Sequence, residues 1–419
     1  MVLKCLCLDA RQRSLYSTNV LINKAGVDDR LRILASAARF DVCGGGPLDI
    51  RASELPAHFI HRAALPDGGC VSLFKVLMTN ACVNDCAYCV SAASRNVRRT
   101  AFKPEELART FMELNRRRLV EGLFLSSGIA ESPDCAMEGI VKTVEILRKK
   151  LGFKGYIHAK MLPGASSDRI EAVCALASRV SVNIEAPTAA HLGRLSTKKN
   201  LLDGIMAPMH QAQALQEASP RLIPAGQTTQ FVVGAAGEKD ADILGTAAGL
   251  YHDIGLRRIY FSAYQPIPHS RLEGVSATSP WRQHRLYQAD WLLRVYGFSP
   301  TEVSLALDGQ GNLSLKINPK RAIARACPWL FPVDVNRGSY EELLRVPGIG
   351  PLAAKRLVEM RRLQAVSSVE QLKKLRVRYR EAMPYIWFKG MSPYEKQLSF
   401  LTDLEEKTES CCGVPAGAV

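Results

Sequence analysis

The chain has 419 residues and carries 55 Lys and Arg against 40 Asp and Glu, a formal net charge of +15. Hydrophobic residues make up 47% and charged residues 23%, which excludes a disordered or collagen-like chain. No apolar run reaches the roughly 20 residues of a membrane-spanning helix, and the N-terminal apolar stretch is too short for a secretory signal. We therefore expect a cytoplasmic protein with no membrane partner, and its positive charge favours polyanionic partners.

The first two zones of the chain differ in their hydrophobic pattern. Residues 1–60 are predicted to be an N-terminal extension with one helix near 28–40, whereas residues 61–275 alternate apolar runs with amphipathic stretches. That alternation indicates parallel strand–helix units. Six units are too few for a complete eight-stranded barrel, so we predict an α/β fold with a partial barrel or an open sheet. The predicted strands are 71–78, 122–125, 156–159, 179–184, 228–233 and 258–263, with helices such as 104–118 and 137–150 between them.

The C-terminal third begins after Pro266-Ile267-Pro268, which interrupts the pattern. Residues 276–333 are predicted to be a connecting helix, near 281–296, and a loop. Residues 334–395 are predicted to form a small all-α domain, and residues 396–419 a flexible tail. The connecting helix carries an unusually polar set, which indicates either a solvated face or a substrate-facing wall over the barrel mouth: His284, Arg285, Tyr287, Gln288 and Asp290.

Three of the twelve cysteines form the sharpest motif of the chain. Cys82, Cys86 and Cys89 follow the first predicted strand in a Cys-x3-Cys-x2-Cys array, with Tyr88 before the last of them. Three thiolates on one loop can converge on a metal centre, and an iron–sulfur cluster of four irons would keep one iron open for another ligand. Buried thiols or a structural zinc site are the alternatives, although zinc sites usually combine two Cys/His pairs and no second pair is obvious.

This Cys-x3-Cys-x-aromatic-Cys motif after the first strand resembles that of the radical S-adenosylmethionine (SAM) superfamily. The resemblance implies a partial six-unit (β/α) barrel related to the TIM barrel, a [4Fe-4S] cluster on Cys82, Cys86 and Cys89, and SAM on the open iron. Reductive cleavage of SAM would give a 5′-deoxyadenosyl radical that abstracts hydrogen from the substrate. An electron donor such as flavodoxin or ferredoxin would then be a partner.

The resemblance also suggests SAM contacts at the ends of the later strands. Where the family often carries Gly-Gly-Glu after the second strand, this chain has Ser126-Ser127-Gly128, which lacks the acid. A buried acid on the fourth strand, such as Glu185, is costly unless it is paired, which favours a function for it. A strand-end turn or a solvated charge remains the alternative for most of these positions. The full set of candidates is Tyr88, Ser126, Ser127, Gly128, Lys160, Asn183, Glu185, Gln230 and Gly234.

A second motif lies in the C-terminal domain, where a short helix is followed by Pro347-Gly348-Ile349-Gly350 and a helix that begins at Pro351. Glycine permits the tight hairpin, and the N–H groups at the start of the next helix favour a phosphate. Lys355 and Arg356 add charge one turn later. The stretch resembles the helix-hairpin-helix motif of DNA repair proteins, which implies that Gly348, Gly350, Lys355 and Arg356 contact the DNA backbone. A hairpin that mediates only protein contacts is the alternative.

Basic residues are concentrated around this hairpin, since residues 336–400 carry 13 Lys and Arg but only 6 Asp and Glu. Such charge predicts salt-dependent, sequence-tolerant phosphate binding. Arg95, Arg98 and Arg99, close to the cysteines, form another basic stretch that either contacts substrate phosphate or faces solvent.

Residues 28–390 together resemble one family, the radical SAM proteins assigned to DNA modification or repair, which are often associated with a uracil-DNA-glycosylase-like partner. The resemblance implies a radical SAM enzyme that acts on nucleic acid, most readily DNA. Two other hypotheses remain open: a radical SAM enzyme whose substrate is a protein or a small molecule, and a non-catalytic DNA-binding protein with a metal site. The sequence does not distinguish repair from modification.

Overall fold

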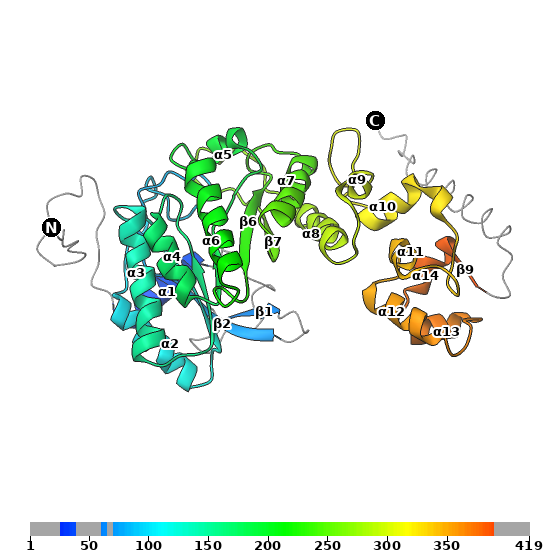
Figure 1. The fold of residues 1–419 in the computed structure, drawn as a ribbon. Helices are drawn as coiled ribbons and strands as arrows, with labels where there is room; N and C mark the ends of the chain where they lie inside the picture. Colours follow the sequence, from blue (N-terminus) through cyan, green and yellow to red (C-terminus); the bar gives the residue numbers. More distant parts are fainter. Residues whose placement is uncertain (1–25, 39–59, 65–69, 389–419) are drawn as a thin grey trace, which may run out of the picture. The chain divides into compact units, whose positions relative to one another are not determined.

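The computed structural model describes residues 26–38, 60–64 and 70–388, which fall into two compact units (Figure 1). The first unit reaches Glu238 and includes Gly249–Gln283, and the second contains Lys239–Ala248 and the chain from His284 onward. The predicted flexible tail at 396–419 lies outside the described residues. No helix in the described ranges combines the length and apolar character needed to cross a membrane.

The first unit is built on one open seven-stranded sheet whose strands follow each other in chain order. Strand β1 (Ile60–Ala64) pairs antiparallel with β2, and all later pairs are parallel. The parallel strands are β2 (Cys70–Leu77), β3 (Gly122–Ser126), β4 (Tyr156–Lys160), β5 (Arg179–Ser181), β6 (Gln227–Val233) and β7 (Arg258–Ala263). The α/β fold with six parallel strands in an open barrel, expected from the alternating pattern, is therefore confirmed.

Two details of the sheet differ from the sequence prediction. Strand β1 was not anticipated. Strand β5 ends at Ser181 rather than at residue 184, because the chain leaves the regular ladder and Glu185 has a left-handed backbone with φ 67°. A non-glycine residue in this region is strained unless its surroundings hold it.

Most helices of this unit pack on the outside of the sheet (Figure 1). Their starts follow local chemistry: Pro104 opens α2, where a missing N–H has no cost, and the hydroxyl of Ser132 accepts from Cys135 N to cap α3. The helices are α1 (Val27–Ala38), α2 (Pro104–Arg116), α3 (Pro133–Glu145), α4 (Ser167–Leu176), α5 (Ala189–Leu195), α6 (Ala207–Ala218) and α7 (Asp240–Asp253); α7 runs from the second unit into the first.

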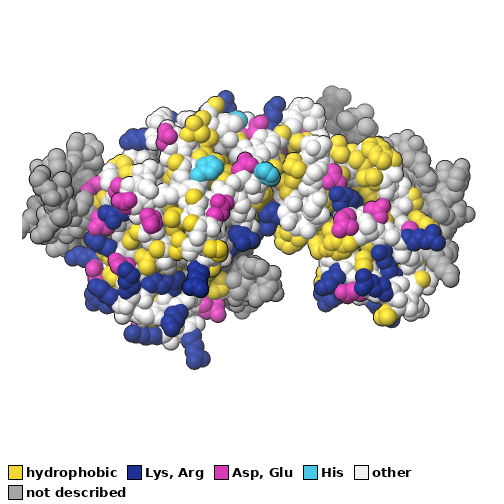
Figure 2. Space-filling view, viewed as in Figure 1, with side chains coloured by type: hydrophobic (Ala, Val, Ile, Leu, Met, Phe, Trp, Pro, Cys, Tyr) yellow, Lys and Arg dark blue, Asp and Glu magenta, His cyan; other side chains and the backbone are white. Residues whose placement is uncertain are grey.

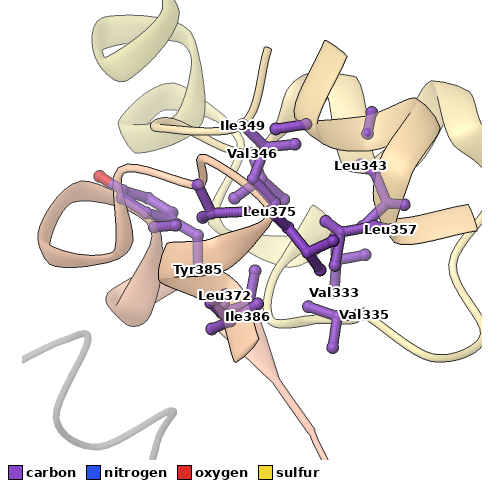
Figure 3. Close-up of a cluster of buried hydrophobic side chains, with 14 of the residues drawn as sticks. Val333, Val335, Leu343, Val346, Ile349, Leu357, Leu372, Leu375, Tyr385 and Ile386 are labelled. Atoms are coloured by element: carbon purple, nitrogen blue, oxygen red, sulfur yellow. The ribbon is translucent and has the colours of Figure 1, made fainter. Parts of the chain in front are cut away.

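The second unit is mainly helical, with one two-residue parallel strand pair. Its elements are α8 (Pro280–Arg294, which begins in the first unit), α9 (Pro300–Ser304), α10 (Pro319–Ala326), β8 (Val333–Asp334), α11 (Tyr340–Arg345), α12 (Pro351–Met360), α13 (Val369–Lys374), α14 (Tyr379–Ala382) and β9 (Ile386–Trp387). Capping boxes at Ser339 and Ser368 start α11 and α13. Figure 3 shows the buried apolar cluster that joins these elements, with Ile349 of the hairpin among its members.

Candidate functional site

The strand ends of the first unit surround a cavity of about 460 Å³. Residues from β2, β3, β4, β6 and β7 face it together, which requires the sheet to curl around it. The cysteine loop forms another part of its lining. Of the candidates for the cluster and SAM, the lining includes Cys82, Cys86, Tyr88, Cys89, Ser126, Ser127, Gly128, Lys160, Asn183, Glu185 and Gln230, but not Gly234.

The cysteine loop is held against the end of β3 by main-chain hydrogen bonds. Gly128 N donates to Thr79 O at 2.7 Å, and Val83 N donates to Ile129 O at 2.7 Å. A Cβ on Gly128 would lie only 2.3 Å from Ala81 O. Gly128 is therefore required for the close approach of two backbones at the site.

Arg99 organises the same loop from inside. Its side chain is buried, and its guanidinium donates to four carbonyl oxygens, those of Asn80, Ser91, Ala92 and Arg95. All of this hydrogen bonding is internal, so the alternative that Arg99 binds substrate phosphate is wrong. Arg95 donates to Pro268 O at 2.5 Å, and Arg98 is exposed, 3.9 Å from a carboxylate oxygen of Asp29.

The three thiols need a positive centre if they are to ionise together. Burial, and then the neighbouring Cys86, raise the pKa of Cys89 to about 12. Iron–sulfur clusters and metal ions stabilise such thiolates. Within the described ranges, no three His, Cys, Asp or Glu side chains surround one point as a mononuclear metal site requires. A cubane cluster instead takes one thiolate per iron, so its ligands need not meet at one atom.

A buried ion pair stands beside the cysteines. Lys199 Nζ donates to Glu185 Oε1 and to the hydroxyl oxygen of Tyr88, each at 2.8 Å. The side chains of Lys199 and Glu185 are only 9% and 4% exposed. Burial alone would lower the pKa of Lys199, but the Glu185 carboxylate raises it above its usual value, so the ammonium stays charged. Sequence reasoning missed Lys199 because a Lys-Lys pair between helices is typical of a solvated loop.

The hydrogen bond from Lys199 uses only one of the two carboxylate oxygens of Glu185. Its main chain is fixed on both sides, since Glu185 N donates to Gln230 O and Val232 N donates to Glu185 O. Its Oε2 atom is buried and has no hydrogen-bond partner in the part of the chain that the structure describes. A buried carboxylate oxygen is costly to leave unsatisfied, and Glu185 is one of the residues that line the cavity.

The other strand-end candidates divide into cavity residues and structural ones. Lys160 donates a short hydrogen bond to the amide oxygen of Asn183, so both present polar atoms within the cavity. Gly234 has φ 89°, and a Cβ there would meet the Thr278 hydroxyl at 2.0 Å. Gly234 therefore permits the tight turn that follows β6. Glu238 accepts from Gly234 N and Ala236 N and so closes the same turn.

The second unit contains the hairpin, with Gly348 at φ 83°. A Cβ on Gly348 would lie 2.6 Å from Arg378 O, and one on Gly350 would lie 3.1 Å from the Tyr296 hydroxyl. Both glycines thus allow tight packing inside the unit, a role the sequence did not reveal. Gly350 is also the residue before α12, whose start has no side-chain cap.

The two predicted phosphate contacts lie on α12, where Lys355 is exposed and Arg356 is half-buried. Figure 2 shows Lys and Arg side chains gathered over the part of the second unit where Figure 1 places α12 and α13. The geometry is therefore that of a basic surface beside a helix start, a combination that attracts phosphate.

The polar set on α8 separates into two groups. Arg285 and Asp290 are 7% and 1% exposed. Arg285 donates to the carbonyls of Ser314 and Leu315, and Asp290 pairs with Arg294 at 2.9 Å. A solvated face is therefore the wrong description for these two residues. His284, Tyr287 and Gln288 line a second cavity, of about 350 Å³, within the second unit.

Comparison with known proteins gives one family match, to the helix-hairpin-helix motif over residues 332–377. That span contains the hairpin and both capping boxes, so the motif expected from the sequence is confirmed. No curated protein matches the chain.

The fold is also similar to solved structures. One is the crystal structure of HydG, a maturase of the [FeFe]-hydrogenase, with 16% identity, a TM-score of 0.42, and coverage of 52% of this chain and 49% of that one. Another is the FeFe-hydrogenase maturase HydG from Carboxydothermus hydrogenoformans, with 14% identity, a TM-score of 0.40, and coverage of 50% and 48%. The chain thus spans about half the length of these structures.

Proposed function

We propose that the protein is a radical SAM enzyme that acts on nucleic acid. The observation that carries the proposal is the cavity that Cys82, Cys86, Cys89 and Glu185 line together. Thiols suit a [4Fe-4S] cluster, and a carboxylate oxygen without a partner suits the amino group or ribose hydroxyls of SAM. When bound, the cluster and SAM would supply reductive C–S cleavage and a 5′-deoxyadenosyl radical.

The chain's own residues would bind and orient these groups. Cys82, Cys86 and Cys89 would hold the cluster, and Lys199 would fix the Glu185 carboxylate and the Tyr88 hydroxyl by the two hydrogen bonds that it donates. Ser126, Lys160, Asn183 and Gln230 would contact SAM from the strand ends. The enclosing strands would limit water near a reactive species.

Nucleic acid is the proposed substrate class because the same chain carries the helix-hairpin-helix motif. Exposed Lys355, half-buried Arg356 and the uncapped start of α12 offer charge and N–H groups to a phosphate backbone. Repair or modification of DNA, a glycosylase-like protein partner and a flavodoxin or ferredoxin as electron donor belong to this proposal. They rest on the family resemblance of the sequence.

The decisive experiment is anaerobic reconstitution followed by an assay of SAM cleavage with and without DNA. Cys82→Ala, Cys86→Ala and Cys89→Ala should each lose iron and abolish cleavage, whereas Cys135→Ala, a thiol outside the cavity, should retain both. A triple variant that still binds four irons and cleaves SAM would contradict the cluster assignment.

The substrate class needs its own readout. Deuterium transfer from a labelled oligonucleotide into 5′-deoxyadenosine would identify nucleic acid as the hydrogen donor. We expect distorted or single-stranded DNA to be better than duplex, because a stacked base cannot enter a barrel. Transfer from a protein or metabolite pool, with none from DNA or RNA, would exclude a nucleic-acid substrate.

A further inference from the structure

The second unit contains a cavity of about 350 Å³ that the proposed reaction does not use. One side is a single face of α8, where His284, Tyr287, Gln288 and Trp291 follow at helical spacing. The opposite side is the hairpin itself, Gly348–Gly350, with Lys320 at the start of α10. Trp291 is 48% exposed, so part of its side chain is open to a ligand.

The charges around this cavity favour an anion. Lys320 Nζ is fixed between the carbonyl of Ile349, at 2.5 Å, and the ring of Tyr296, whose centroid is 4.7 Å away. Arg378 also lines the cavity, but it pairs with Glu381 at 3.1 Å, so this pair adds no net charge. A protonated Lys320 would therefore leave the lining with a positive balance.

We propose that this cavity binds one unpaired nucleotide of a nucleic-acid strand, with the base stacked on Trp291 and a phosphate near Lys320. Aromatic rings beside cations are the features by which proteins bind single strands, since every base offers a face for stacking. The volume of about 350 Å³ lies near the lower end for a small-molecule pocket, which suits one nucleotide. The inference rests on the proposed nucleic-acid function for its ligand class.

Such a pocket would give the second unit a preference for unpaired DNA, which the hairpin alone would not give. Backbone contacts to phosphate are tolerant of strand structure, whereas a pocket for an unpaired nucleotide requires a single-stranded or frayed segment. The second unit would then select such DNA for the proposed reaction.

The test uses the full-length protein and a labelled single-stranded oligonucleotide, with an intact duplex as the second ligand. Trp291→Ala should weaken single-strand binding about 10-fold, from the usual contribution of one stacked base, and leave duplex binding unchanged. Trp291→Phe should preserve the affinity but remove the quenching of tryptophan fluorescence. Trp329→Ala, which removes a tryptophan that is 75% exposed and lies outside the cavity, is the matched control and should change neither.

The outcomes separate this inference from the proposed function. Unchanged single-strand affinity of Trp291→Ala, together with weaker binding of Lys355→Glu/Arg356→Glu, would overturn the pocket and keep the nucleic-acid interface. An equal loss for single strand and duplex would also overturn it, because a nucleotide pocket cannot act on paired bases. A wild-type protein that binds neither ligand would reject the nucleic-acid function and the pocket together.

Discussion

The cysteine cavity of the first unit and the hairpin surface of the second use charged residues in different ways. In the first unit, Lys199 and Glu185 are buried as a pair beside the cysteines. In the second, an apolar cluster fills the interior (Figure 3), and cations such as Lys355 lie at the surface. Burying charge weakens a fold unless the pair is fully satisfied. The cavity of the first unit therefore contains a buried ion pair, whereas the cations of α12 lie at the surface of the second unit.

Removing one member of the buried pair should give the largest effect. Glu185→Gln leaves the Lys199 ammonium buried without its counter-charge, so we expect a loss of about 3–5 kcal/mol in the free energy of unfolding. Urea denaturation of the full chain measures it. The matched control is Glu145→Gln, since Glu145 and Lys149 are also 2.8 Å apart but are 44% and 65% exposed. That control should leave stability unchanged, and equal losses for both variants would contradict the comparison.

The close approach of two backbones at the cysteine loop should be the next most sensitive feature. Gly128→Val places a side chain where Ala81 O lies 2.3 Å from the Cβ position, so the loop must move. We expect iron content after reconstitution to fall to a small fraction of the wild-type value. Gly139→Ala, whose Cβ would meet only Met78 Cε at 3.6 Å, should retain full iron. A Gly128→Val protein with normal iron would show that the loop does not depend on this close approach.

Sequence alone predicted the architecture better than the site. Apolar runs and intervening helices gave the six parallel strands, because burial on both faces of a parallel strand leaves a clear pattern. The cysteine spacing and the hairpin are also patterns of neighbouring residues, so the sequence predicted both motifs. It did not predict the role of Lys199, because the burial of this side chain depends on a loop that folds back onto Tyr88 and Glu185. Arg99 was misread for the same reason: its four carbonyl partners are a tertiary feature.

Surface charge on the second unit should control affinity without affecting the fold. Lys355→Glu/Arg356→Glu replaces two cations on α12, so nucleic-acid binding should weaken for all sequences alike. The slope of log K against log salt should fall by about 2, because each phosphate that the protein no longer neutralises lowers it by about 0.9. Arg116→Glu/Arg117→Glu makes the same change in charge at the C-terminal end of α2, at exposed positions of the first unit. If both double variants bound equally weakly, the net charge of the chain would matter rather than the hairpin surface.

The smallest expected effect concerns Lys320, whose ammonium donates to the carbonyl of Ile349 in the hairpin. Burial, and then the charge of Arg378, lower the pKa of Lys320 from 10.5 to about 7; Arg345 acts in the same direction and Glu381 opposes them. Below pH 7 the amine is protonated in both the folded and unfolded states, so the cost of the buried charge is present in full. Between about pH 7 and 10.5 the unfolded chain binds more protons than the folded one, so stability from this group rises with pH.

Lys320→Met removes that dependence. The variant should gain melting temperature over the wild type near pH 6.5, and the gain should shrink as the pH approaches 9.5. Lys316→Met, at an exposed position of the same unit, should give a difference from the wild type that does not vary with pH. A constant difference for Lys320→Met across this range would mean that its ammonium is as well solvated as a surface lysine. The position of Lys320 beside the hairpin would then have no measurable cost for the fold.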